Sequence, residues 1–210
     1  MQVNRDNFAS SFDVSRETIE RLDEYEALLK KWNPVINLIS RNTLDDIWQR
    51  HFADSAQLYL HIGDNPKTWL DFGSGAGFPG LVAATIAKQK NPKLTFTLVE
   101  SDQRKAAFLM TVSNALDLGA KVIAERIEAL PAQNADIISA RAVAPLDKLL
   151  SWTAPHAHKT SVLLFPKGNS YESELTAARK HWHIGEEIIP SVTDSNAVIL
   201  RIEEFERVVY

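Results

Sequence analysis

Four glycines fall within eight residues of one another, directly after a short, mostly apolar segment. The stretch from Trp69 to Gly80 reads W-L-D-F-G-S-G-A-G-F-P-G, and a helical pattern follows it. Glycine has no Cβ and tolerates positive φ, so such a loop lets the backbone come unusually close to a bound molecule. In open α/β sheets, ligands bind outside the carboxyl ends of the strands. The stretch therefore predicts a strand, a ligand-binding loop and a helix.

The glycine spacing helps to identify the ligand. A dinucleotide loop needs glycines at its first, third and sixth positions. Counted from Gly73, the sixth position is Phe78; counted from Gly75, the glycines fit, but Pro79 then occupies the stretch that should open the helix with free N–H groups. The pattern D-x-G-x-G-x-G, which begins at Asp71, resembles the S-adenosylmethionine loop of class I methyltransferases. Pro79 is expected at the first helical position, where a missing N–H leaves no partner unsatisfied.

Strand and helix patterns alternate after residue 66, which predicts parallel strands joined by helices. We expect strands near 68–72, 95–100, 120–124, 136–140 and 161–165. We expect helices near 80–90, 102–118, 144–153 and 171–182. The segments 184–189 and 197–202 lie close enough in sequence to form a hairpin, which predicts an antiparallel end to the sheet. The layout is that of the class I methyltransferases: an α/β, Rossmann-like fold with a mostly parallel seven-stranded sheet that ends in an antiparallel hairpin.

The first 66 residues carry a different pattern, which predicts an N-terminal helical extension. Apolar residues recur at helical spacing from Val14 to Trp32 and again from about Leu44 to His61. The segment 33–40 is expected to link these helices, and the breakers at 63–66 to end the extension. We expect residues 1–66 to form a helical cap on a core of residues 67–210, in one compact unit.

Composition narrows the class of protein. The absence of cysteine excludes disulfides and thiolate metal sites. The chain has no run of about eighteen apolar residues, and its start is too polar for a signal peptide, so we expect a cytoplasmic protein without a membrane span. The net charge of −4 argues mildly against nucleic acid as a partner. However, residues 67–210 carry 16 basic and 16 acidic side chains and are therefore neutral. Affinity for nucleic acid depends on local basic surface and not on the total charge.

Two carboxylates are candidates for cofactor binding. Glu100 ends the second expected strand, twenty residues after Gly80, where a carboxylate accepts the hydroxyls of an adenosine ribose. This role is common to methyltransferases and dehydrogenases. Asp71 is expected to orient the loop or to reach the ammonium group of the cofactor, directly or through water. Together with Gly73, Gly75 and Gly77, these residues form the cofactor site that the pattern predicts.

Cationic residues follow three of the expected strands and therefore lie at one edge of the sheet. They are Arg126, Arg141 and Lys167. A single one would be an ordinary surface ion pair or loop lysine, but three on one edge favour a rim that binds phosphate or carboxylate. His51 alone is more typical of a structural histidine. The pairs 156/158 and 181/183 are spaced i, i+2, which does not place both histidines on one helix face, so no metal site is expected.

Several further motifs occur in an order that is specific to one family. They are K-W-N at 31–33, I-N-L-I-S at 36–40, R-H-F-A-D-S at 50–55, the loop at 71–80, S-A-R-A at 139–142 and K-G at 167–168. The chain resembles the RsmG (GidB) family, bacterial methyltransferases that act on guanine N7 in 16S ribosomal RNA. The resemblance covers roughly residues 15–205. Pro166 departs from it, because the family more often carries another residue there.

The resemblance implies the reaction and further site residues. It implies methyl transfer from S-adenosylmethionine, without a metal, to N7 of a single guanine in the 530-loop region of 16S rRNA. It adds Phe78, Ile127, Glu128 and Arg141 to the cofactor site. It places Arg126 and Arg141 near the transferred methyl group or the RNA as catalytic residues. We expect the substrate to be bound by Asn37, His51, Arg126 and Lys167.

The expected chemistry needs little acid–base catalysis. Guanine N7 carries a free lone pair at neutral pH, so no base has to deprotonate it, and alignment is the main requirement. The product guanine is positively charged, so we expect Arg141 to position the cofactor carboxylate or an RNA phosphate without touching the reacting ring. The expected partner is 16S rRNA, the small subunit or an assembly intermediate, and the chain is expected to be a monomer.

Three other functions remain open from the sequence. One is a class I methyltransferase that acts on a small molecule or a protein. Another is a nicotinamide-dependent oxidoreductase, which Phe78 and the terminal hairpin disfavour. The last is a non-catalytic RNA- or ribosome-binding module that keeps the glycine loop only for structure.

Overall fold

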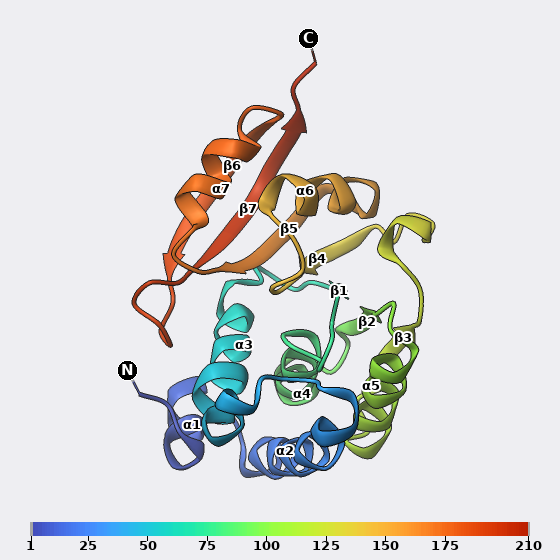
Figure 1. The fold of residues 1–210 in the computed structure, drawn as a ribbon, viewed down its shortest axis with the longest axis vertical. Coiled ribbons are helices and arrows are strands. Elements are labelled where there is room, and N and C mark those ends of the chain that lie inside the picture. Colours follow the sequence, from blue (N-terminus) through green and yellow to red (C-terminus); the bar gives the residue numbers. More distant parts are fainter. Residues whose placement is uncertain (1, 210) are drawn as a thin grey trace.

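Seven strands form one sheet in the order β3-β2-β1-β4-β5-β7-β6 in the computed structural model, which describes residues 2–209 (Figure 1). The strands are β1 (Thr68–Phe72), β2 (Thr95–Val99), β3 (Lys121–Ile123), β4 (Ala135–Ser139), β5 (Ala157–Lys167), β6 (Trp182–Pro190) and β7 (Val198–Arg207). The pairs among β1 to β5 are parallel, whereas β7 is antiparallel to both β5 and β6. The predicted mostly parallel sheet with a terminal hairpin is confirmed. β5 continues through Pro166, which lies opposite Ile199 of β7.

Helices cover both faces of this sheet. They are α4 (Gly80–Lys90), α5 (Gln103–Ala115), α6 (Leu146–Thr153) and α7 (Tyr171–Ala178), with short 3-10 turns η4 (Ile127–Ala129) and η5 (Ala154–His156). Asp102 caps α5, because its side chain accepts hydrogen bonds from two N–H groups of the first turn. Pro79 is one residue earlier than predicted: it is the N-cap of α4, and Gly80 is the first helical residue.

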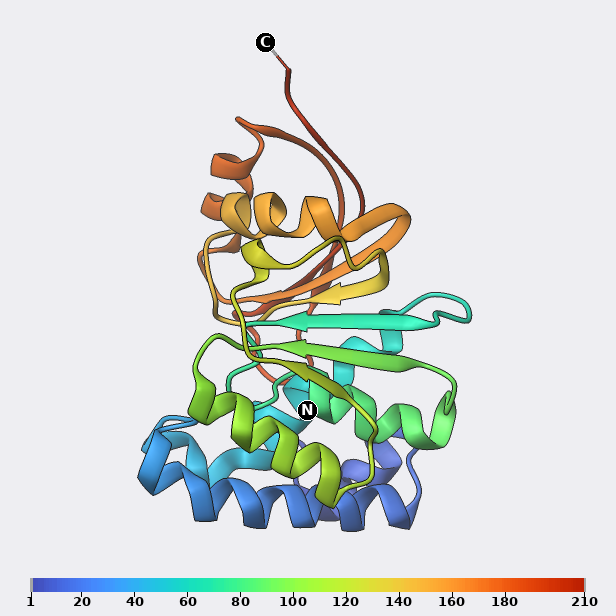
Figure 2. The same cartoon turned by 90° about the vertical axis from the view of Figure 1, so that its right-hand side faces the viewer.

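The N-terminal helices form an outer layer over α4 and α5. In Figure 2, α2 (Arg16–Ile36) lies beneath both of these helices, and the strands β1, β2 and β4 point to the same side of the molecule. The apolar side of α2 is buried in one cluster with α4 and α5. A second cluster joins α6 and α7 to the other face of the sheet, so the sheet is covered on both sides.

The N-terminal segment differs from its prediction in three places. The helix α1 (Arg5–Phe12) was not expected; a capping box at Asn4 begins it, and Phe8 and Phe12 bury its inner side. The helix α2 runs through Pro34 to Ile36, so the linker is shorter than 33–40. No helix within residues 2–209 is both long and apolar enough to cross a membrane.

The third difference concerns the helix predicted from Leu44 to His61. The structure has four consecutive pieces there: η1 (Arg41–Asp46, 3-10), η2 (Trp48–Ala53, π), α3 (Asp54–Ala56) and η3 (Gln57–His61, 3-10). Tertiary contacts explain the irregular winding, because Trp48, Phe52 and Ala53 are all buried against neighbouring elements. A π-helical turn widens the helix locally and often occurs at functional sites.

Candidate active site

The glycine loop leaves β1 at the carboxyl edge of the sheet, beside β4. The chain continues from β1 to β2 and β3 on one side and from β4 to β5 on the other, and ligands bind at such a switch point. Gly73, Gly75 and Gly77 have φ angles of +65°, +55° and +94°, which only glycine adopts readily. A Cβ on Gly73 would overlap Val143, and a Cβ on Gly77 would overlap the Tyr25 hydroxyl. Both the backbone conformation and the close neighbours therefore require glycine.

Glu100 ties this loop to the end of β2. Its Oε2 accepts a hydrogen bond from the Gly75 N–H at 2.8 Å, and its Oε1 accepts one from the Asp102 N–H at 2.8 Å. Each carboxylate oxygen has about two acceptor positions, so each keeps one free for another donor. The placement fits a carboxylate that receives ribose hydroxyls beside the loop. That role stays a prediction.

Asp71 points into the protein. Its Oδ1 accepts a hydrogen bond from the Ser139 hydroxyl at 2.6 Å, which links β1 to β4. Its Oδ2 accepts no hydrogen bond from any residue between 2 and 209 and lies against the backbone of Gly80, where a Cβ would crowd it. Burial raises the pKa of Asp71 to about 6. Of the two expected roles, this geometry favours orienting the loop over direct contact with a cofactor ammonium group.

A small cavity of about 90 Å³ lies above the ends of β1 and β2. Its walls are Phe72, Gly73, Val99, Ser101, Glu125, Arg126, Ile127, Glu128, Val143 and Trp152. Three predicted cofactor residues, Gly73, Ile127 and Glu128, therefore come together here with Arg126. Cofactor-sized ligands occupy sites of roughly 300 Å³ or more. Val143 also lines the neighbouring larger cavity, so this one residue borders both cavities.

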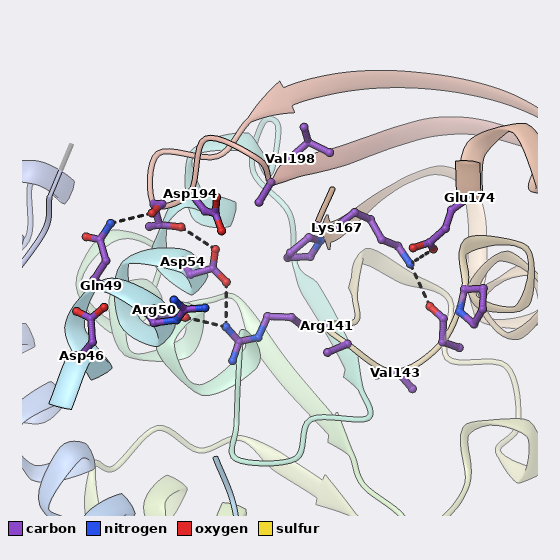
Figure 3. Close-up of a pocket in the computed structure, with 17 residues that line it drawn as sticks. Asp46, Gln49, Arg50, Asp54, Arg141, Val143, Lys167, Glu174, Asp194 and Val198 are labelled. Carbon is purple, nitrogen blue, oxygen red and sulfur yellow. Dashed lines mark hydrogen bonds and ion pairs between the residues drawn. The ribbon is translucent and has the colours of Figure 1, made fainter. Parts of the chain in front are cut away.

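The larger cavity has a volume of about 580 Å³, and Val143 is one of the residues that line it (Figure 3). It is lined by Asp46, Gln49, Arg50, Asp54, Arg141, Ala142, Val143, Ala144, Pro145, Pro166, Lys167, Gly168, Glu174, Thr193, Asp194, Ala197 and Val198. These residues come from the irregular N-terminal helix, the loop after β4, the end of β5, α7 and the β6–β7 loop. The cavity is large enough for a nucleobase and stands next to the glycine loop.

Arg141, in the loop after β4, lines the larger cavity and is held in place by the N-terminal segment (Figure 3). Its Nη1 donates to Asp54 Oδ2 at 2.9 Å and to the carbonyl oxygen of Arg50 at 3.2 Å. Its Nη2 lies 3.0 Å from His51 Nδ1, and its guanidinium carbon lies 5.0 Å from the centre of the Phe78 ring. The side chain of Arg141 is only 18% exposed. The arginine predicted for the rim is thus fixed in one orientation beside the glycine loop.

The contact with Arg141 defines the protonation state and the tautomer of His51. A guanidinium only donates hydrogen bonds, so His51 Nδ1 accepts and the ring is neutral with its proton on Nε2. That Nε2 then donates to the Thr43 hydroxyl, 2.9 Å away. Burial, and then the nearby charges of Arg141 and Arg50, lower the pKa of His51 to about 3. His51 also stacks on Phe78 at a centroid distance of 4.9 Å.

Lys167 lines the larger cavity but is bound to an internal carboxylate. Its Nζ lies 2.7 Å from Glu174 Oε2 and donates to the Ala144 carbonyl at 3.0 Å, and its side chain is 8% exposed. Glu174 also accepts a hydrogen bond from the Leu146 N–H. The pair therefore connects β5, α7 and the loop after β4. Whether Lys167 contacts substrate stays a prediction.

The other predicted site residues lie in different surroundings. Asn37 is exposed at the end of α2 and lines neither cavity. Phe78 is 3% exposed and packed between Tyr25 and His51, outside the lining of both cavities. Within residues 2–209, no three His, Asp or Glu side chains converge as a metal site would require.

The sequence matches the family described as rRNA small subunit methyltransferase G over residues 18–200. A protein named ribosomal RNA small subunit methyltransferase G from Cereibacter sphaeroides (strain ATCC 17023) is 50% identical over 204 residues, which is 97% of this chain and 99% of that protein. A protein of the same name from Jannaschia sp. (strain CCS1) is 50% identical over 188 residues, with 90% and 89% covered. This chain belongs to the methyltransferase G family.

Solved structures agree with this assignment at the level of the fold. A SAM-dependent methyltransferase from Aquifex aeolicus aligns with a TM-score of 0.59 at 14% identity, covering 84% of this chain and 97% of that one. TYW2 from M. jannaschii, solved in complex with AdoMet, aligns with a TM-score of 0.56 at 15% identity, covering 81% and 78%. The predicted fold class and the predicted family are both confirmed.

In this methyltransferase G family member, the two cavities are also lined by residues that the sequence analysis did not predict for the site. Asp54 stands in the R-H-F-A-D-S motif, but no role was predicted for it. Its position three residues after His51 is the sequence feature that could have indicated a place in the site. Val143, Trp152, Glu174 and Thr193 had no local signal, because only the fold brings them to the cavities.

Proposed function

We propose that this chain transfers the methyl group of S-adenosylmethionine to N7 of a single guanine in 16S ribosomal RNA, in the 530-loop region. Its family makes it an rRNA small subunit methyltransferase, and its fold is that of S-adenosylmethionine-dependent enzymes. The observation that carries the proposal is the cavity of about 580 Å³ beside the glycine loop, in a chain that matches this family over residues 18–200.

The residues around the cavities suit a transfer that needs alignment more than proton removal. When bound, S-adenosylmethionine supplies a methyl group that is already activated by the sulfonium charge. Guanine N7 presents a lone pair at neutral pH, so no side chain has to remove a proton. His51 is neutral, but Arg141 engages its Nδ1 and Thr43 lies against its Nε2, which leaves it unsuited to act as a base.

The proposed cofactor site follows the carboxyl edge of β1, β2 and β4. Glu100 would receive the ribose hydroxyls, and Ile127 and Glu128 would lie beside the adenine. The whole proposed cofactor set is Asp71, Gly73, Gly75, Gly77, Phe78, Glu100, Ile127, Glu128 and Arg141. The unoccupied acceptor positions of Glu100 and the missing Cβ of Gly73 support this assignment. Asp71 and Phe78 would act by shaping the loop, since both are buried.

The catalytic residues proposed are Arg126 and Arg141, with Asn37, His51, Arg126 and Lys167 on the substrate side. Asp54 offsets the charge of Arg141 at 2.9 Å. This matters because N7-methylguanine carries a positive charge, which an unpaired arginine would repel. Arg141 would therefore position the cofactor carboxylate or an RNA phosphate and leave the reacting ring untouched.

The proposal also includes the binding partner, the oligomeric state and the cellular location of the protein. The substrate would be 16S rRNA, alone or within the small subunit or an assembly intermediate, and the protein would act as a cytoplasmic monomer. Residues 1–66 would act as a cap that helps to present the RNA to residues 67–210. The contacts of Asp54 and His51 with Arg141 support this role, because they bring the N-terminal segment into the site.

Methyl transfer from labelled S-adenosylmethionine to small-subunit rRNA that lacks the modification tests the function. We expect label at one guanine, mapped to N7 by chemical cleavage at N7-methylguanine. The assay should use both protein-free rRNA and assembled small subunits, with already methylated rRNA as the control. Label at another atom would overturn the N7 assignment. Cofactor binding without RNA labelling would favour a small-molecule or protein substrate instead.

A further inference from the structure

Three cationic residues line the large cavity, and only one of them has an uncompensated charge. Arg141 is paired with Asp54 at 2.9 Å and Lys167 with Glu174 at 2.7 Å. Arg50 is exposed, and its guanidinium makes no hydrogen bond or ion pair with any residue from 2 to 209. The positive charge free to meet a polyanion at this cavity is therefore that of Arg50.

The remaining charges in the lining oppose a phosphate deep inside the cavity. Besides the two paired carboxylates, Asp46 and Asp194 also line it. Carboxylates repel phosphate but accept hydrogen bonds from base amino groups. The cavity interior therefore suits a base, whereas a phosphate of the same nucleotide chain belongs at its edge, where Arg50 is exposed.

The backbone of Arg50 is fixed by the site itself. Arg50 lies in the π-helical turn η2, whose Trp48 and Phe52 are anchored in the core. Its carbonyl oxygen accepts a hydrogen bond from Arg141 at 3.2 Å, and the next residue, His51, stacks on Phe78 of the glycine loop. In Figure 3, Arg50 and Arg141 lie side by side, joined by this hydrogen bond. The free guanidinium thus extends from an anchored turn next to the reaction site.

We infer that Arg50 binds a phosphate of the RNA substrate at the edge of the large cavity. The inference rests on the proposed function, because it takes RNA as the substrate. Arg50 supplies a charge-assisted contact to a phosphodiester, and its tie to Arg141 sets the distance between that phosphate and the methyl-transfer site. It acts in RNA binding and positioning, not in cofactor binding.

RNA binding by Arg50→Ala, Arg50→Lys and the wild-type protein tests this role. The probe is a fluorescently labelled 16S rRNA transcript that lacks modifications, titrated at several salt concentrations. We expect Arg50→Ala to weaken binding about tenfold and to lower the slope of log K against log salt by about one, as the loss of one phosphate contact does. Arg50→Lys keeps the charge and should recover most of the salt slope.

Two further measurements separate this role from structural damage. The affinity for S-adenosylmethionine and the thermal midpoint should be unchanged in both variants, and KM for RNA should rise while kcat stays near the wild-type value. Arg16→Ala removes an exposed arginine at the start of α2 and should have no effect. Wild-type RNA affinity and slope in Arg50→Ala would overturn the inference, as would an equal loss of cofactor binding. If the wild-type protein methylated no RNA at all, the proposed function itself would fail.

Discussion

Two titratable side chains near the glycine loop, the partly buried His51 and the fully buried Asp71, have pKa values shifted in opposite senses from the ordinary ranges of their types. Burial lowers the pKa of His51 to about 3 and raises the pKa of Asp71 to about 6. The cause is the same, because burial disfavours the charged form of either group. At neutral pH, His51 is therefore an uncharged acceptor for Arg141, and only an uncharged ring can fill that position.

The pKa of His51 predicts how stability depends on pH. Unfolded histidine takes up a proton near pH 6.5, but folded His51 does so only near pH 3, so the unfolded state binds more protons between these values. Stability should therefore fall on acidification below about pH 6.5. In a variant with His51→Gln, this contribution is absent.

Urea unfolding at pH 7, 6 and 5 measures the effect. We expect the wild-type free energy of unfolding to lose about 2 kcal/mol more than that of His51→Gln between pH 7 and pH 5. The raised pKa of Asp71 has the opposite effect, because it gives stability that is lost as pH rises through about 6. Asp71 is present in both proteins, so its contribution cancels in the comparison. Parallel pH curves for the two proteins would contradict the account.

At the level of elements, the irregular N-terminal helix holds two loops of the core in place. Asp54 accepts hydrogen bonds from Arg141 in the loop after β4 and from Thr193 in the β6–β7 loop, at 2.9 and 3.0 Å. Gln57 adds contacts to Ser191 and Val192 in the same loop. Both loops line the large cavity, so the winding of this segment determines the cavity's shape.

A double-mutant cycle with Asp54→Asn and Arg141→Met tests this link. Each single change leaves a partly buried polar group without its ionic partner, whereas the double change removes both charges. We expect a coupling energy of about 1–3 kcal/mol in urea unfolding. The exposed change Asp45→Asn, in η1, is the matched control. Additive effects of the two substitutions would show that the ion pair is energetically unimportant.

The strands could be predicted from the local sequence pattern, but the irregular winding of residues 41–61 could not. The stretches at 68–72 and 95–99 are short, rich in apolar and β-branched residues, and followed by breakers, so their structure is encoded locally. In contrast, Trp48 and Phe52 show helical spacing, but burial against α1 and α2 changes the winding to π and 3-10. Tertiary contacts therefore overrode a correct helical periodicity.

On the scale of the whole molecule, the N-terminal layer and the core share one hydrophobic cluster. Leu22, Tyr25 and Phe52 pack with Phe78 of the glycine loop and Phe108 of α5. The Tyr25 hydroxyl also donates to the carbonyl of Ala76 in the loop. Removing the N-terminal helices would expose the outer sides of α4 and α5 and leave the loop without its support.

A fragment of residues 67–210 is therefore expected to lose both solubility and cofactor binding. Exposed apolar surface of this extent favours aggregation over an independent fold. Expression of the fragment beside the full chain, with sedimentation and S-adenosylmethionine titration, makes the comparison. A soluble fragment that binds the cofactor but no longer methylates RNA would instead assign the N-terminal layer to RNA presentation alone.

The site was predictable in part, for a physical reason. The glycine loop and Glu100 follow strand ends, so their shared edge could be predicted from parallel topology alone. The partners of the cations could not: Asp54 and Arg141 are 87 residues apart, and Lys167 meets Glu174 only because α7 folds back beside β5. Charges that looked free in the sequence are consequently neutralised in the fold.

The central claim is that methyl transfer takes place at the carboxyl edge between the glycine loop and Arg141. A crystal structure of the protein with bound S-adenosylhomocysteine tests it most directly. We predict the ribose hydroxyls within hydrogen-bond distance of Glu100, the adenine beside Ile127, and Val143 displaced so that the two cavities join. A ligand bound away from Gly73 and Glu100, or one that leaves Val143 against Gly73, would contradict the account.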